Sequence, residues 1–155
     1  MPMYLTIILG VSALTVVLLL LIHAVGRVFR GNLERAVSEY FDATHIIRKD
    51  LWANYFGRSK KGMAQIRGNG ALVLTNAQLW FLLAAPRTEI DIPLDRITRV
   101  STTRSHLGKT NFRPLLFVEF ETPEGPDSIA WSLRHPDEWV ATVEAARANV
   151  NTDAT

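Results

Sequence analysis

The segment Tyr4–Val25, YLTIILGVSALTVVLLLLIHAV, decides how the rest of the chain must be placed. It contains no Asp, Glu, Lys or Arg, and the first such residue in the chain is Arg27. As a helix it would be roughly 33 Å long, which is enough to cross the ~30 Å hydrocarbon core of a bilayer. Apolar side chains cover every side of it, whereas a surface helix of a soluble domain carries a polar stripe. We therefore predict a single transmembrane anchor at residues 1–26.

The residues on either side of this segment predict that it is not cleaved off, and they also predict its orientation in the membrane. A cleaved signal peptide starts with basic residues and has a shorter apolar core, but Met1–Met3 contains no Lys or Arg. Arg27, Arg30 and Arg35 follow the segment closely, and basic residues near a span mark its cytoplasmic side. We expect a single-pass inner-membrane protein with its N-terminus outside and its C-terminal domain in the cytoplasm. The absence of cysteine agrees with that reducing compartment.

The juxtamembrane segment, residues 27–50, has the pattern of a second helix and a linker. Gly31–Asn32 is predicted to interrupt the anchor helix, and LERAVSEYFDATHII follows with helical periodicity. Leu33, Val37 and Tyr40 fall near one face of this amphipathic helix. We expect that face to pack on the chain's own domain. The alternatives are that it lies among lipid headgroups or pairs with a second copy.

From Leu51 onward the chain has the pattern of a small β-domain of ordinary size. Apolar runs rich in β-branched and aromatic residues alternate with turn residues, which predicts about seven short strands. These strands are expected at 52–57, 71–75, 78–84, 88–92, 97–103, 115–122 and 128–133.

The last predicted element is a helix, PDEWVATVEAARAN, that follows the strands. Pro136 and two acidic residues in the first turn are typical of a helix N-terminus. We expect this helix to cap one open end of the barrel, with Trp139 as the plug, and residues 149–155 to form a flexible tail. Among Trp52, Trp80 and Trp131, at least two should face the core, and one that points outward would mark a partner surface.

Two runs in the β-domain resemble bacterial pleckstrin-homology-like (PH-like) and GRAM-like domains. Gly70–Phe81, GALVLTNAQLWF, resembles their G-x-L-x-L-T-x-x-x-L-x-F run, and Ile92–Val100, IPLDRITRV, resembles the I-P-L-x-x-I-x-x-V segment that follows. The resemblance covers residues 51–148. It implies an α+β, mainly β fold: a PH-like barrel of two roughly orthogonal sheets with a C-terminal helix. It also implies a binding or scaffolding module without catalysis.

Basic residues gather in two segments that contain no acid, residues 57–67 and 99–113. The candidate site residues in them are Arg58, Lys60, Lys61, Arg67, Arg99, Arg104, Lys109 and Arg113. If both segments lie at one end of the barrel, they form a positive rim that attracts anionic lipid headgroups or an acidic protein partner. The first segment also corresponds to the loop that phosphoinositide-binding relatives use. The alternative is that these are ordinary solvated loop charges.

Other classes of function have little support in the sequence. The formal net charge of +2 is too near neutral for a nucleic-acid binder, and aromatic residues are not interleaved with the basic ones as stacking platforms. The chain has no cysteine and no HxxxH or HExxH spacing, so neither a metal site nor a cofactor is predicted. No serine has a nucleophile-elbow context. We do not expect an enzyme.

Taken together, these features predict a membrane-anchored module that recruits or assembles a protein partner at the cytoplasmic face. The first alternative is binding of anionic lipid headgroups through the two basic segments. The second is an accessory subunit of a larger membrane complex, with the anchor helix as the docking surface.

Overall fold

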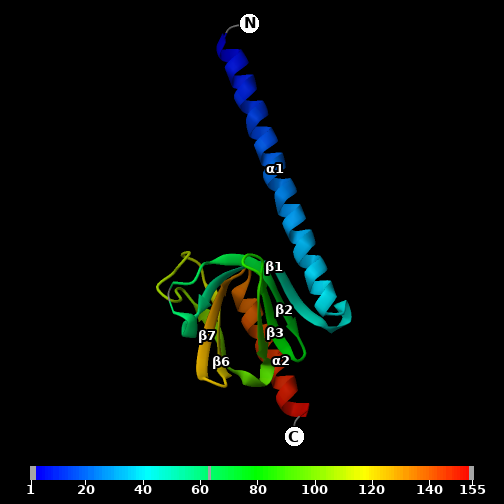
Figure 1. Cartoon of the computed structure of the whole chain (residues 1–155), viewed down its shortest axis with the longest axis vertical. Coiled ribbons are helices and arrows are strands. Elements are labelled where there is room, and N and C mark those ends of the chain that lie inside the picture. The colour runs from blue at the N-terminus through cyan, green and yellow to red at the C-terminus, as the bar shows by residue number, and fades with distance from the viewer. Residues whose placement is uncertain (1–2, 63, 154–155) are drawn as a thin grey trace.

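The computed structural model describes residues 3–62 and 64–153, and it contains the predicted strands and the C-terminal helix in the predicted order (Figure 1). The helices are α1 (Met3–Tyr40) and α2 (Pro136–Asp153), and the short 3-10 turns are η1 (Ala43–His45), η2 (Ser59–Lys61) and η3 (Leu94–Arg96). The strands are β1 (Ile46–Arg58), β2 (Gly68–Thr75), β3 (Gln78–Leu83), β4 (Thr88–Pro93), β5 (Ile97–Thr103), β6 (Leu115–Thr122) and β7 (Gly125–Ser132). The α+β, mainly β class is confirmed.

The seven strands form one antiparallel sheet in the order β4-β3-β2-β1-β7-β6-β5. β1 is shared by both halves of the sheet: it pairs with β2 along most of its length and with β7 through Asn54–Arg58. Its register shifts between Asp50 and Ala53 and again between Tyr55 and Gly57. Such bulges bend a strand. The two sheets that the family resemblance implies are therefore joined here through β1.

Helix α2 packs on β5, η3 and β6 and closes the barrel. Trp139 is only 2% exposed and lies in the main core with Val143 and Ala146, which confirms its predicted place as a plug. The helix continues to Asp153, so residues 149–153, which we expected in a flexible tail, are helical. The reason is that Val150 still packs against the core and holds the last turns. Residues 154 and 155 lie outside the described residues.

Helix α1 is a single helix of 38 residues, so the predicted interruption at Gly31–Asn32 is wrong. A glycine inside a helix costs only about 1 kcal/mol relative to alanine, and packing directly after it offsets this loss. Leu33, Ala36 and Val37 are buried against Ala71, Val73, Trp80 and Leu82 on the outer face of β2 and β3. The prediction that this face packs on the chain's own domain is confirmed.

The chain leaves α1 earlier than the helical pattern predicts. The Asp42 carboxylate accepts hydrogen bonds from the backbone N–H and the hydroxyl of Thr44, which turns the chain through η1. β1 then begins at Ile46, and residues 46–50 pair with β2 rather than extending a helix. This correction adds Arg48 and Lys49 to the first strand.

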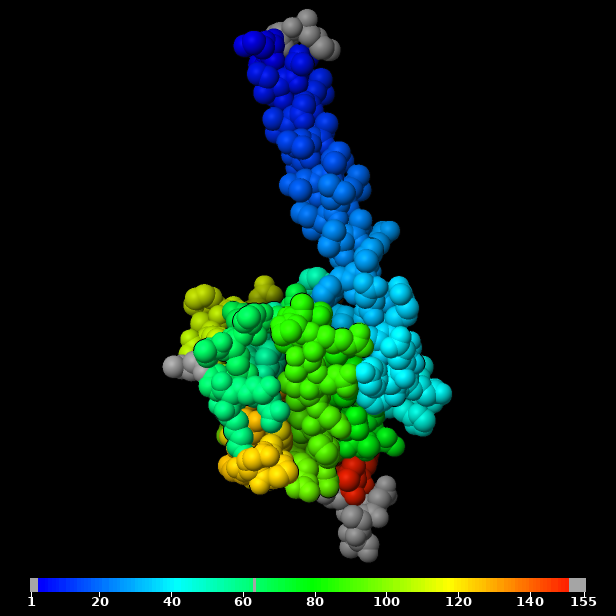
Figure 2. Space-filling model, in the orientation of Figure 1, coloured from blue at the N-terminus to red at the C-terminus, as the bar shows by residue number. Residues whose placement is uncertain are grey.

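The N-terminal part of α1 projects away from the domain (Figures 1 and 2). Within the described residues, α1 is the one helix long and apolar enough to cross a membrane by length and composition. None of its most apolar window is buried in the fold.

Candidate functional site: a basic groove beside the first helix

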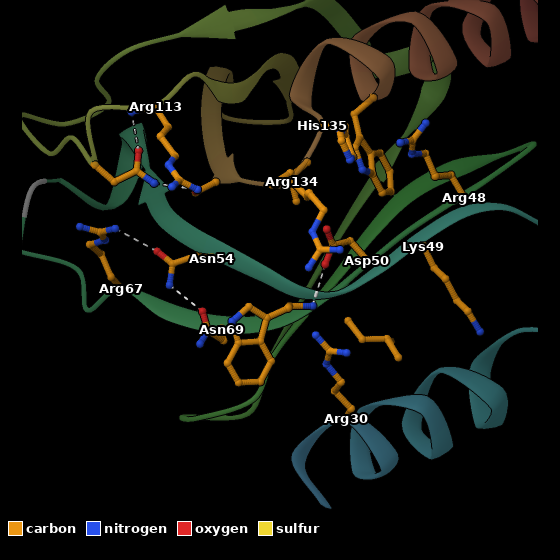
Figure 3. Close-up of a pocket in the computed structure, with 16 residues that line it drawn as sticks. Arg30, Arg48, Lys49, Asp50, Asn54, Arg67, Asn69, Arg113, Arg134 and His135 are labelled. Atoms are coloured by element: carbon orange, nitrogen blue, oxygen red, sulfur yellow. Dashed lines mark hydrogen bonds between the residues drawn. The ribbon is translucent and has the colours of Figure 1, made fainter. Parts of the chain in front are cut away.

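A groove of about 810 Å³ lies where α1, the middle of β1, the start of β2, the β5–β6 loop and the β7–α2 junction meet (Figure 3). We call it the basic groove. Asp50 is the single acidic residue among the described residues that line it. The basic residues that line it are Arg30, Arg48, Lys49, Arg67, Arg113 and Arg134.

The bulge in β1 shapes the floor of the groove. Asp50 Oδ1 accepts a hydrogen bond from the backbone N–H of Trp52 at 2.7 Å, within the segment where the β1–β2 register shifts. Trp52 remains 45% exposed, with its ring edge-on to Phe29 at 5.1 Å and under Arg30 at 5.7 Å. Trp52 is thus the tryptophan that faces outward. Trp80 and Trp131 are buried, as predicted for at least two of the three.

The cations at one side of the groove are already neutralised. Arg48 Nη2 lies 2.7 Å from Glu138 Oε2, and its guanidinium stacks over Trp139. The hydrogen bond from Arg48 lowers the pKa of Glu138. Lys49 forms an ion pair with Glu34 of α1. These two cations fasten α2 and α1 to β1, so they contribute more to the frame of the site than to its free charge.

The other side of the groove keeps its charge. Arg67 stacks over Phe56 at 3.8 Å and donates to Asn54 Oδ1 at 3.1 Å, so it is held in place by neutral groups. Arg113 and Arg134 are exposed and form no ion pair within the described chain. Guanidinium groups bind phosphate and carboxylate oxygens through paired hydrogen bonds. This side of the groove can therefore hold an anion.

Neutral side chains fix the loop that carries Arg113. Asn111 Nδ2 donates to Ser132 Oγ at 2.6 Å, and Asn111 Oδ1 accepts from the Arg113 backbone N–H at 3.2 Å. Asn54 Nδ2 donates to Asn69 Oδ1 at 2.7 Å across β1 and β2. The wall between the arginines is thus built from ordered amides (Figure 3).

Arg58, a predicted site residue, instead belongs to a buried ion pair. Its Nη2 lies 2.6 Å from Asp127 Oδ2, and Asp127 is 3% exposed. Burial raises the pKa of Asp127. Hydrogen bonds from the Lys60 backbone, Ser59 Oγ, Arg58 and the Ser128 backbone outweigh that effect and leave the pKa below its usual value. Arg58 is therefore committed to holding η2 against β7.

The other five predicted site residues, Lys60, Lys61, Arg99, Arg104 and Lys109, do not line the groove. Lys60 Nζ donates to Thr122 at 2.9 Å, and Arg99 lies 3.6 Å from Glu119 on the neighbouring strand. Lys61 and Arg104 are exposed, outside the groove. Lys109 Nζ donates to the Gln65 carbonyl oxygen at 2.7 Å, which ties the two basic segments together.

The two segments thus meet, but only Arg67 and Arg113 of the eight predicted residues line the groove. Arg30, Arg48, Lys49 and Arg134 were missed. They come from a helix, a strand and a junction that are far apart in the sequence, and no local pattern links them. Among the described residues, no group of three or more His, Asp or Glu side chains could hold a metal ion.

No protein-family model matches the chain, and no curated protein matches it. Among solved structures, the Vps36 N-terminal PH domain superposes with a TM-score of 0.51 and 20% sequence identity, covering 69% of this chain and 81% of that domain. The C-terminal domain of an unknown protein from Leishmania infantum has a TM-score of 0.48 and 14% identity, covering 80% and 98%. An SsgB structure from Streptomyces coelicolor has a TM-score of 0.34 and 14% identity, covering 64% and 88%.

The likeness to the Vps36 domain, over 69% of this chain, shows a PH-like fold. This agrees with the class that the two sequence runs predict. The fold alone does not determine what such a domain binds.

Proposed function

We propose that this protein is a single-pass membrane module, without catalytic activity, whose cytoplasmic PH-like domain binds an anionic lipid headgroup in the basic groove. The observation that supports the proposal is that several guanidinium groups of the groove, among them Arg67, Arg113 and Arg134, have no carboxylate partner and lie beside a helix apolar enough to span a bilayer. Both features belong to one folded unit because α1 runs unbroken from the apolar segment into its packing on β2 and β3.

The position of Arg30 on α1 supports a lipid as the source of the anion. Arg30 follows Val25, the last residue of the apolar segment, by five residues, or about 7.5 Å along a helix. The headgroup layer on each side of a bilayer is about 5–7 Å thick, from the difference between core and total thickness. With Val25 at the edge of the hydrocarbon, Arg30 and the groove entrance lie next to the headgroups.

The strength expected of this site follows from its free charges. A Lys or Arg near an anionic leaflet contributes about 1 kcal/mol, so three guanidinium groups contribute about 3 kcal/mol. At about 1.4 kcal/mol for each factor of ten, this is a difference of about a hundredfold in affinity. Salt should weaken it, because the groove is open to solvent.

The test uses the full chain in mild detergent and measures retained lipid by native mass spectrometry. The groove variant carries Arg67→Gln, Arg113→Gln and Arg134→Gln. The control variant loses the same charge outside the groove through Lys61→Gln, Arg96→Gln and Arg99→Gln. We expect wild type and control to retain phosphatidylglycerol over phosphatidylcholine, and the groove variant to lose this preference. Equal retention by the groove variant, or an equal loss in the control, would contradict the proposal.

A second candidate function, recruitment of a protein partner at the membrane, is favoured by the exposure of Trp52. An exposed tryptophan beside arginines has the composition of a binding hot spot. Its test is gentle extraction of the full chain, followed by comparison of the proteins that co-purify with wild type and with Trp52→Ala. A defined protein lost only from the variant would support recruitment. A protein retained by both would instead favour docking through the anchor helix, as in a subunit of a larger membrane complex.

A further inference from the structure

Among the large apolar side chains outside α1 in the described chain, two are far more exposed than the rest. Phe112 is 94% exposed and Ile66 is 73% exposed, whereas the next, Ile47 and Trp52, are about half exposed. Phe112 belongs to the β5–β6 loop and Ile66 to the segment that enters β2. We call these two residues the apolar tips.

The two tips belong to neighbouring loops. Lys109 Nζ donates to the carbonyl oxygen of Gln65 at 2.7 Å, directly before Ile66. A second contact joins the β5–β6 loop to the end of β1, because His106 Nε2 lies 3.1 Å from the Gly57 carbonyl oxygen. The loop that carries Phe112 is therefore in direct contact with the segment that carries Ile66.

The backbone holds Phe112 outward. Its φ of 62° lies in the left-handed region, which is uncommon for a bulky residue. The Phe112 backbone N–H donates to Thr110 Oγ1 at 3.0 Å, and Asn111 is tied to Ser132. Hydrogen bonds thus fix the residues that precede Phe112, while the ring itself remains in solvent. Residues held in such uncommon backbone conformations cluster at functional sites.

Each tip is followed by an arginine of the basic groove, Arg67 after Ile66 and Arg113 after Phe112. An apolar side chain next to a cation suits the boundary between headgroups and acyl chains, where the apolar part is buried and the cation meets phosphates. The β5–β6 loop lies at the end of the domain from which α1 projects (Figures 1 and 2).

We propose that Ile66 and Phe112 insert into the interfacial zone of the bilayer that α1 crosses and so form a second membrane attachment. This inference rests on the proposed function only in requiring that α1 spans the membrane. The lipid surface is the occupant that the geometry favours, because the arginine after each tip lines the same groove as Arg30, which closely follows the apolar segment of α1. The packing of Leu33, Ala36 and Val37 on the sheet fixes the position of the domain relative to α1.

The experiment uses the absence of cysteine, which makes each introduced thiol unique. Full-length Phe112→Cys, Ile66→Cys, Arg96→Cys and Leu14→Cys are labelled with a small environment-sensitive fluorophore. Each is placed, one copy per disc, in nanodiscs of phosphatidylcholine and phosphatidylglycerol. Quenching by spin-labelled lipids reports contact with the membrane, and quenching by iodide reports contact with water. Arg96 in η3 is the exposed control on the domain, and Leu14 reports the span.

We expect labels at 66 and 112 to be quenched severalfold more by shallow spin-labelled lipids, and severalfold less by iodide, than the label at 96. Tip labels that behave like the label at 96 would overturn the inference. Tip labels shielded from iodide but not quenched by lipid would also overturn it, because they would be covered by protein. If the label at 14 also escapes lipid quenching, the span itself fails, and the proposed function fails with it. Circular dichroism of each labelled variant confirms that the sheet is intact.

Discussion

Replacing Arg58 by glutamine should destabilise the domain without weakening anion binding in the groove. The sequence and the structure assign Arg58 different roles, ligand binding in one case and a structural ion pair in the other. The basic segment predicts a ligand-binding side chain, whereas the structure pairs it with the buried carboxylate of Asp127 at 2.6 Å. Arg58→Gln keeps the first three carbons of the side chain and removes the guanidinium group that pairs with Asp127, so its effect reports mainly the loss of the ion pair.

The size of the effect follows from burial. Removing one partner of a buried pair costs about 3–5 kcal/mol, because a charge is left uncompensated. Asp127 keeps hydrogen bonds from Ser59, Lys60 and Ser128, and the Arg58 side chain is itself 24% exposed. We therefore expect the low end, about 3 kcal/mol. At about 4 °C per kcal/mol for a domain of this size, the melting temperature falls by about 12 °C.

This fall in melting temperature is measured by heating the full chain in mild detergent and monitoring the circular dichroism signal of the sheet. The pH dependence gives a second check. The native pKa of Asp127 is lowered, so the stability it contributes is present above the ordinary carboxyl value of 3.8 and is lost as pH falls through the native value. Asp127→Asn should therefore lack the component of acid destabilisation that wild type shows there.

Either of two results would refute the reasoning on Arg58. One is a melting temperature of Arg58→Gln within a degree or two of wild type. The other is a loss of phosphatidylglycerol retention in Arg58→Gln as large as that of the groove variant at a temperature where the variant is folded. A double variant with Asp127→Asn completes the cycle, and it should be less destabilised than the sum of the two single changes.

Four further predictions concern packing and helix propensity. Trp139→Ala should lower stability by about 3–5 kcal/mol, measured by the denaturant midpoint, because the plug is 2% exposed. Gly70→Ala should separate β2 from β3 and sharply lower the melting temperature, since the added Cβ would lie 2.1 Å from the Leu82 carbonyl oxygen. Gly31→Ala meets no atom within 4 Å and should instead raise helix stability by up to about 1 kcal/mol. Val37→Asp should release the end of α1 from the sheet and speed its cleavage in limited proteolysis, because Val37 is 1% exposed.

The strands and α2 could be predicted from the sequence because their patterns are local. Runs such as LLFVEFET alternate with period two and end at turn residues, and Pro136 with its acidic neighbours marks a helix start. The burial of Trp139 and the packing of the face around Val37 also follow from helical periodicity. Each of these features depends on residues within a few positions of one another.

The features that could not be predicted depend on tertiary contacts. Gly31, which is followed by Asn32, favours a break in the helix. Leu33 and Val37 pack on β2 and β3, however, and keep α1 continuous. Ile46 and Ile47 close the predicted helical run, yet residues 46–50 pair with β2 as a strand. The basic groove joins Arg30, Arg67 and Arg134 across three elements and a bulge, which no window of sequence contains.

The docking of α1 on the sheet has a consequence for how a ligand is found. A domain on a slack tether samples a wide volume and can capture molecules from solution, but here the helix that leaves the apolar segment is the same helix that packs on the barrel. With α1 in a bilayer, as proposed, the domain would have little freedom to search. Lipids would have to diffuse laterally to it, so their surface density in one leaflet, and not any concentration in the cytosol, would set how often the groove is filled.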